Sequence, residues 1–155
     1  MFCFFDHSTL ASPFREQHNN FMHSQRRGFG SWIWKPHVIE MALETASPAD
    51  VVIYLDAEFI LNTRGRNRFI GYIDITLDSP GKMLSYQNIH TKHRWTKADL
   101  AKRLGVLEKP RILSTSQLSS GFILLGKTGS NGDLVRERKK VAVERNYHYS
   151  DGYSF

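Results

Sequence analysis

The sequence predicts an α/β fold in which a mostly parallel β-sheet is flanked by helices. Two runs, residues 51–55 and residues 121–125, are continuously apolar. That pattern is typical of strands buried on both faces, as in parallel sheets covered by helices. Segments with the apolar spacing of helices lie before, between and after the two runs. An alternation of helices and buried strands indicates an α/β architecture.

The first clear helix is predicted to begin at Pro36. Proline suits a first helical position, because its missing N–H would be unpaired there in any residue. Apolar residues at positions 38, 39, 42 and 43 form one face, and Ser47-Pro48 ends the pattern. The strand over 51–55 follows after a short turn and leads directly into Asp56-Ala57-Glu58.

The second half of the sequence predicts three more helices and a short strand. Apolar spacing indicates a helix over 69–77, although its β-branched residues also suit a strand, and residues 82–86 suit a short strand. Thr96 resembles the start of a capping box for a helix that reaches about Leu104, where Gly105 ends it. Asn131 is expected to cap a last helix that runs to about Arg145.

Size and composition indicate one globular domain. The chain has 155 residues, of which 41% are hydrophobic and 23% charged, values close to globular averages. No stretch of about 18 apolar residues occurs, which excludes a membrane-spanning helix. The single cysteine, Cys3, excludes an intrachain disulfide and a cysteine-cluster metal site, and it favours a reducing, cytoplasmic location.

Charge is distributed unevenly along the chain. Residues 1–60 carry 4 basic and 7 acidic side chains, a balance of −3, and the remainder carries 17 basic and 8 acidic, a balance of +9. Such an excess suggests an anionic partner, which could be nucleic acid, a phosphorylated ligand or an acidic membrane surface. An ordinary solvated surface explains the same numbers, so the charge alone does not decide the function.

Two carboxylates follow the first strand. In open α/β sheets ligands bind beyond the carboxyl ends of strands, and Asp56 and Glu58 stand at such an end. Together they could hold Mg²⁺ or Mn²⁺, with water or phosphate oxygens completing the coordination. The alternative is that Asp56 caps the next turn and Glu58 faces solvent.

A glycine-rich basic segment precedes the first helix. Gly28 and Gly30 permit tight turning or close approach of the backbone to a ligand. The neighbouring cations, including Arg27 and Lys35, together with the helix N-terminus favour phosphate. The two tryptophans at positions 32 and 34 could stack on a base or sugar, or belong to the core.

These motifs together resemble a family of small glycosyltransferase-like proteins of bacterial polysaccharide loci and large viruses. The matching residues are Arg27-Gly28-Phe29-Gly30 with Trp32, Trp34-Lys35-Pro36, Tyr54-Leu55-Asp56-Ala57, Trp95-Thr96-Lys97-Ala98-Asp99-Leu100, and Gln117 followed by Gly121. The resemblance covers roughly residues 21–135. It implies a GT-A-like, Rossmann-like fold in incomplete or minimal form, a single domain over 1–155 that is partial at both ends.

The resemblance further implies a transferase that moves a sugar from a nucleotide-sugar donor to a glycan or other acceptor. Asp56 would lead a DxD-type motif that holds Mn²⁺ or Mg²⁺, with Glu58 as the second metal ligand. Donor-binding residues would be Arg27, Gly28, Lys35, Asp56, Gln117 and Gly121. Trp95, Lys97 and Asp99 would line the acceptor side.

Two other functions stay open at this point. The sequence has Glu58 and Ser31 where the family commonly has glycine and tyrosine, and the basic run 138–140 follows where the family tends to have tryptophan. An inactive glycosyltransferase-like remnant would tolerate these departures. A non-catalytic nucleic-acid-binding module would explain the basic second part, including arginines at 64, 66 and 68, but the aromatic residues typical of an RNA-binding sheet are missing.

Overall fold

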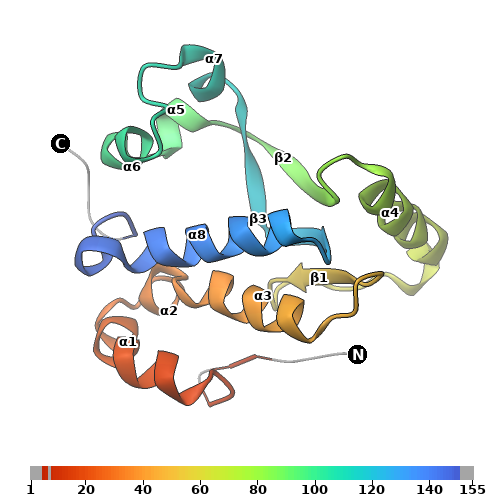
Figure 1. The fold of residues 1–155 in the computed structure, drawn as a ribbon, viewed down its shortest axis with the longest axis horizontal. Helices are drawn as coiled ribbons and strands as arrows, with labels where there is room; N and C mark the ends of the chain where they lie inside the picture. The colour runs from red at the N-terminus through yellow and green to blue at the C-terminus, as the bar shows by residue number, and fades with distance from the viewer. Residues whose placement is uncertain (1–4, 7, 151–155) are drawn as a thin grey trace.

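The computed structural model describes residues 5, 6 and 8–150, and Cys3 lies outside these residues. It shows a small three-stranded sheet with helices around it (Figure 1). In chain order the elements are α1 (Ser12–Ser24), α2 (Gly28–Ser31), α3 (Trp34–Thr45), β1 (Val51–Leu55), η1 (Thr63–Gly65), α4 (Arg66–Asp78), β2 (Met83–Thr91), α5 (Lys92–Trp95), α6 (Ala98–Arg103), α7 (Pro110–Leu113), β3 (Ser116–Gly126) and α8 (Gly129–Tyr147).

The sheet is antiparallel, so the expectation of a mostly parallel sheet is wrong for the described residues. The strand order is β1-β3-β2, and both outer strands pair antiparallel with β3. Residues 121–126 of β3 are all buried, because β1 and β2 pair along the two edges of this half and helices pack on its faces, among them α4 and, in the core, α8 with Val135. A continuous apolar run therefore indicates that a strand is buried on both faces. It does not indicate direction, because a central antiparallel strand can be buried in the same way as a parallel one.

Most of the predicted elements are present. The helix expected over 69–77 is α4, the helix expected after Thr96 is α6, and the short strand expected over 82–86 is the first half of β2. The helix predicted to begin at Pro36 is α3, which begins two residues earlier, so Pro36 lies in its first turn, where the missing N–H breaks no hydrogen bond.

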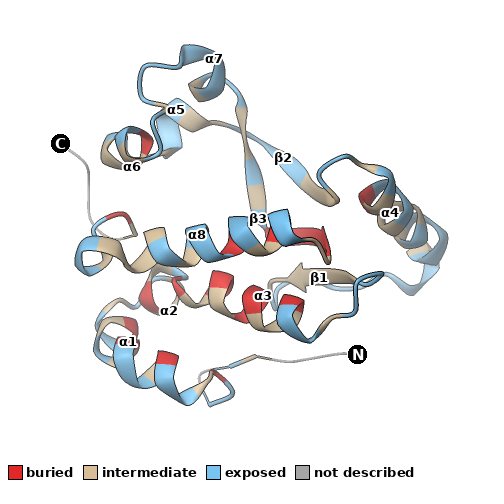
Figure 2. Ribbon diagram, viewed as in Figure 1, coloured by how far each residue is buried: buried red, intermediate tan, exposed pale blue. Residues whose placement is uncertain are grey.

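The core lies between α1, α3, α8 and the buried half of β3. α3 and α8 run side by side (Figure 1), and the buried positions concentrate on α3 and β3 (Figure 2). The hairpin of β2 and β3 extends away from this core and carries α5, α6 and α7 at its far end (Figure 1). Buried apolar residues of the core include Met22, Ile33, Val38, Leu43, Ile123, Leu125 and Val135.

Polar contacts fix α8 against its neighbours. Asn131 does not cap α8 as expected. The Thr128 side chain is the cap, and its Oγ1 accepts from the Asn131 backbone N–H at 3.1 Å. Asn131 itself is buried and donates from Nδ2 to the carbonyl oxygens of Lys82 (3.0 Å) and Gly126 (2.9 Å). Lys139 of α8 forms an ion pair with the buried Glu40 of α3.

No helix within the described ranges is both long and apolar enough to cross a membrane.

Candidate functional site

Asp56 and Lys35 form an ion pair at the end of β1. Lys35 is the second residue of α3 and is buried, whereas Asp56 directly follows β1. The Lys35 Nζ lies 2.7 Å from each of the two Asp56 carboxylate oxygens. Their side chains are 5% and 23% exposed, so the ion pair is largely withdrawn from solvent but opens to it on the Asp56 side.

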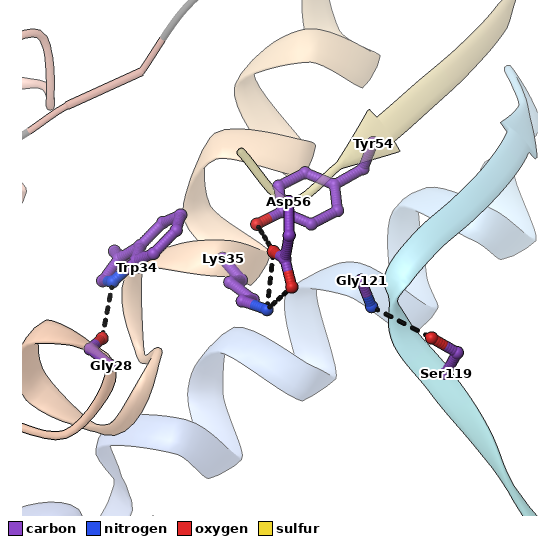
Figure 3. A network of polar contacts seen from close by, with 7 residues as sticks. All are labelled: Gly28, Trp34, Lys35, Tyr54, Asp56, Ser119 and Gly121. Carbon is purple, nitrogen blue, oxygen red and sulfur yellow. Dashed lines mark hydrogen bonds and ion pairs between the residues drawn. The ribbon is translucent and has the colours of Figure 1, made fainter. Parts of the chain in front are cut away.

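Tyr54 is the third member of this cluster. Its hydroxyl donates to Asp56 Oδ1 at 2.6 Å, and Figure 3 shows Lys35 and Tyr54 both pointing at the carboxylate. Burial, followed by the bond to Asp56, raises the pKa of Tyr54 far above its ordinary value. The phenol therefore stays protonated and acts as a hydrogen-bond donor. The sequence reasoning missed Tyr54, although residues two apart in extended backbone share a face.

Gly121 of β3 lies against the other side of the carboxylate. Its carbonyl accepts from the Asp56 backbone N–H at 2.9 Å, and its own N–H faces Ser119 Oγ at 3.4 Å (Figure 3). A Cβ at this position would lie 2.8 Å from Asp56 Oδ2 and 3.1 Å from the Phe59 ring. The site therefore requires a residue without a side chain here.

The segment 28–32 is a turn of left-handed backbone. All five residues have positive φ angles, from 48° to 79°, and the Ser31 and Trp32 N–H groups donate to the carbonyls of Arg27 and Gly28. Such backbone is costly for residues other than glycine. The Trp34 Nε1 also donates to the Gly28 carbonyl at 3.1 Å (Figure 3). The two glycines gave a signal for this turn in the sequence.

Trp32, at the end of the left-handed turn, lies close to two cations. The Arg27 guanidinium lies 5.4 Å and the Lys35 Nζ 5.6 Å from the centre of the Trp32 ring, distances typical of cation–π contacts. Trp32 remains 40% exposed. Gly28 has no room for a side chain, because its Cβ would lie 2.2 Å from the Trp32 ring.

A pocket of about 650 Å³ opens beside this cluster, a size typical of small-molecule sites. Arg138 of α8 lines it and interacts electrostatically with Tyr54 and Asp56. The sequence reasoning did not assign Arg138 to a site. The other lining residues include Trp32, Lys35, Asp56, Glu58, Leu100, Ser120, Tyr149 and Ser150.

Asp56 and Glu58 do not fit a divalent cation. Glu58 lies at the pocket with an exposed side chain. Both oxygens of Asp56 face the Lys35 ammonium, and one also accepts from Tyr54. Over residues 5, 6 and 8–150, no three His, Cys, Asp or Glu side chains gather in a group that could hold a metal ion. A cation at Asp56 would compete with a buried ammonium for the same carboxylate.

Four other predicted residues, Gln117, Trp95, Lys97 and Asp99, are not among the residues that line this pocket. The structure brings together five of the predicted donor-binding residues: Arg27, Gly28, Lys35, Asp56 and Gly121. Gln117 is not part of this group, and its Nε2 donates to Thr96 Oγ1 at 3.3 Å. Trp95 is 55% exposed and packs against His90. The Lys97 Nζ donates to the backbone carbonyl of His148 at 2.6 Å. The Asp99 carboxylate lies 3.0 Å from the Nε2 of the same histidine. These two residues connect α6 to the end of α8.

Comparison of the chain with models of protein families, with curated proteins and with solved structures finds no match.

Proposed function

We propose that this chain binds a nucleotide-sugar in the pocket beside Lys35 and Asp56 and transfers the sugar to a glycan or other acceptor. The observation that carries the proposal is the cluster of Lys35, Asp56 and Tyr54 at the pocket, with Trp32 against the ammonium. It combines cations for phosphate with an aromatic face for a sugar or a base. The family resemblance of the motifs that supply Trp32, Lys35 and Asp56 supports the same reaction.

In the proposed reaction, the bond between the anomeric carbon of the sugar and the diphosphate oxygen breaks. The electron pair stays on the departing nucleoside diphosphate, and the acceptor hydroxyl oxygen bonds to the anomeric carbon and gives up its proton to a base. Charge grows on the leaving diphosphate in the transition state. Positive groups aimed at that charge, here Lys35 and Arg138, would lower the barrier.

The divalent cation that the resemblance implies is not part of this proposal. Asp56 is engaged by Lys35 and Tyr54, and Glu58 is exposed. The proposal therefore assigns no step to Mn²⁺ or Mg²⁺.

The first test is ligand binding by the full chain. Thermal unfolding is followed with a panel of nucleoside diphosphates and nucleotide-sugars. A ligand that binds only the folded protein at 100 times its Kd stabilises it by about 2.7 kcal/mol, which raises the melting temperature of a chain of this size by several degrees. Trp32→Leu should lose this shift, and Trp95→Leu, an exposed tryptophan outside the pocket, should keep it. If no member of the panel shifts the parent chain, the proposal is wrong.

The second test separates an active transferase from an inactive remnant. Many transferases slowly hydrolyse their donor when no acceptor is present, so release of nucleoside diphosphate from the bound nucleotide-sugar is measured over hours. Binding with hydrolysis supports the transferase. Binding without hydrolysis, in the presence of a panel of glycan acceptors, would identify a remnant that keeps the pocket but not the reaction.

A further inference from the structure

Lys35 is a buried ammonium with its counter-ion, Asp56, directly beside it. Its side chain is buried, and it contacts the faces of Trp32 and Tyr54 at 5.6 and 5.7 Å from the ring centres. An ammonium has three N–H donors. Within the described residues its hydrogen bond goes to Asp56 Oδ2, and Asp56 Oδ1 lies at the same distance of 2.7 Å as its ion-pair partner, so at least one N–H donor is left for a ligand in the pocket.

Both oxygens of the Asp56 carboxylate have protein partners. Oδ2 accepts from Lys35, and Oδ1 lies 2.7 Å from the same ammonium and accepts from the Tyr54 hydroxyl, which stays protonated. A divalent cation bound to this carboxylate would lie within a few ångströms of the ammonium and repel it. It would also deprive a buried lysine of its counter-ion, which is strongly unfavourable.

Further positive charge at the pocket comes from arginines. Arg138 lines the pocket, and Arg27 stacks on Trp32, which lines it as well. Guanidinium groups bind phosphate oxygens in pairs of hydrogen bonds. Lysine and arginine side chains are thus present to neutralise a diphosphate, the role that a divalent metal ion has in a metal-dependent site.

We propose that the pocket binds the diphosphate of its ligand through Lys35 and Arg138 without a divalent cation, with Asp56 serving as the counter-ion that holds Lys35 in place. This inference rests on the proposed function and names how that site takes its substrate. Asp56 is a positioning residue in this arrangement, because it acts on the ligand through Lys35 and does not coordinate a metal.

The experiment is isothermal titration of the full chain with UDP, GDP and ADP, once in EDTA and once in MnCl₂. We expect the nucleoside diphosphate that binds to do so in EDTA with an affinity within about threefold of that in Mn²⁺, a difference of under 1 kcal/mol. Titration of Mn²⁺ alone, followed by electron paramagnetic resonance, should show no binding to the parent chain.

Each outcome has a distinct meaning. Affinity that falls more than about tenfold in EDTA, or Mn²⁺ that binds the parent chain alone and is lost in Asp56→Asn, overturns this inference and leaves the proposed function standing. Absence of nucleoside diphosphate binding in both buffers overturns this inference together with the proposed function.

Variants on α8 test the assignment of the cations without disturbing the core. Arg138→Gln should weaken nucleoside diphosphate binding in EDTA by about tenfold, the usual size of a lost charge-assisted hydrogen bond. Arg136→Gln is the matched control, because Arg136 is exposed on the same helix and pairs with Asp133 instead of lining the pocket. Equal loss in both variants, or no loss in Arg138→Gln, would contradict the assignment. Circular dichroism confirms that each variant is folded.

Discussion

Gly121 lies directly against the carboxylate of Asp56, where a Cβ would stand 2.8 Å from Oδ2. We predict that Gly121→Ala pushes the carboxylate out of line with Lys35 and Tyr54. Misplacement of a site by about 1 Å can cost up to about 100-fold in function, and the overpacking itself costs about 1–3 kcal/mol of stability. Nucleotide binding by titration calorimetry and urea unfolding measure the two effects.

Gly71 provides the matched control for this substitution. It lies in α4, and a Cβ there would meet nothing within 4 Å. Gly71→Ala should leave nucleotide binding unchanged and stabilise the chain by up to about 1 kcal/mol, because alanine favours the helix. Similar binding in Gly121→Ala and the parent chain would show that the carboxylate can move without consequence.

The ion pair of Lys35 and Asp56 should contribute to stability in a non-additive way. Asp56→Asn leaves a buried ammonium without its counter-ion, and we predict a loss of roughly 2–4 kcal/mol, below the full value for a buried pair because Asp56 is partly exposed. Lys35→Met should also destabilise. The double variant should lose less than the sum of the two single losses, because no charge then remains unpaired. Urea unfolding of the four proteins measures the coupling, and strictly additive losses would contradict it.

The sequence predicted four of the helices and parts of the three strands, but neither α1 nor the direction of the sheet. Apolar spacing identified α3 and α4, the capping pattern at Thr96 identified α6, and the apolar runs identified β1 and the buried half of β3. These signals are local and report which residues are buried. Strand direction depends on long-range pairing, such as Leu55 opposite Phe122, and composition does not encode it.

The site was predictable in part for the same reason. The motifs indicated Lys35 and Asp56, and both line the pocket. Lys35 lies against both oxygens of Asp56 because α3 packs beside β1. No local sequence pattern shows that packing. Phe29, Ser31 and Trp32 adopt left-handed backbone that side-chain-bearing residues disfavour, so propensity could not predict the whole turn. Asn131 had the residue type of a helix cap, but burial gave it a different role.

Asn131 should be a strong determinant of stability. Its side chain satisfies two carbonyl oxygens, those of Lys82 and Gly126, and so connects α8 to β2 and β3. Asn131→Leu removes both donors and should lower the free energy of unfolding by about 1–3 kcal/mol. Ser130→Ala, at an exposed position beside it, should change it by less than about 0.5 kcal/mol. Urea unfolding of both variants makes the comparison, and equal effects would exclude a structural role for the amide.

The ring of His37 should make the free energy of unfolding depend on pH. Both ring nitrogens are buried and have no hydrogen-bond partner within the described residues, and the ring stacks on Phe14 at 4.2 Å. Burial is the main cause that lowers its pKa below 6.5, and Lys139 adds to the effect, whereas Glu40 and Glu44 oppose it. The pKa of the nearby His18 is also lowered, again mainly by burial.

Because the folded-state pKa values of these histidines are lowered, the unfolded chain binds more protons below about pH 6.5. Stability should therefore be full above that pH and fall as the pH decreases through 6.5 toward the folded-state values. His37→Leu removes an unsatisfied polar ring, so at pH 7.5 it should be as stable as the parent or more stable by up to about 1 kcal/mol. Between pH 7.5 and 5.5 the free energy of unfolding of His37→Leu should fall by less than that of the parent chain. The fall should not be zero, because His18 remains. Urea unfolding at several pH values measures this, and an unchanged slope in His37→Leu would show that the ring is not held neutral by the fold.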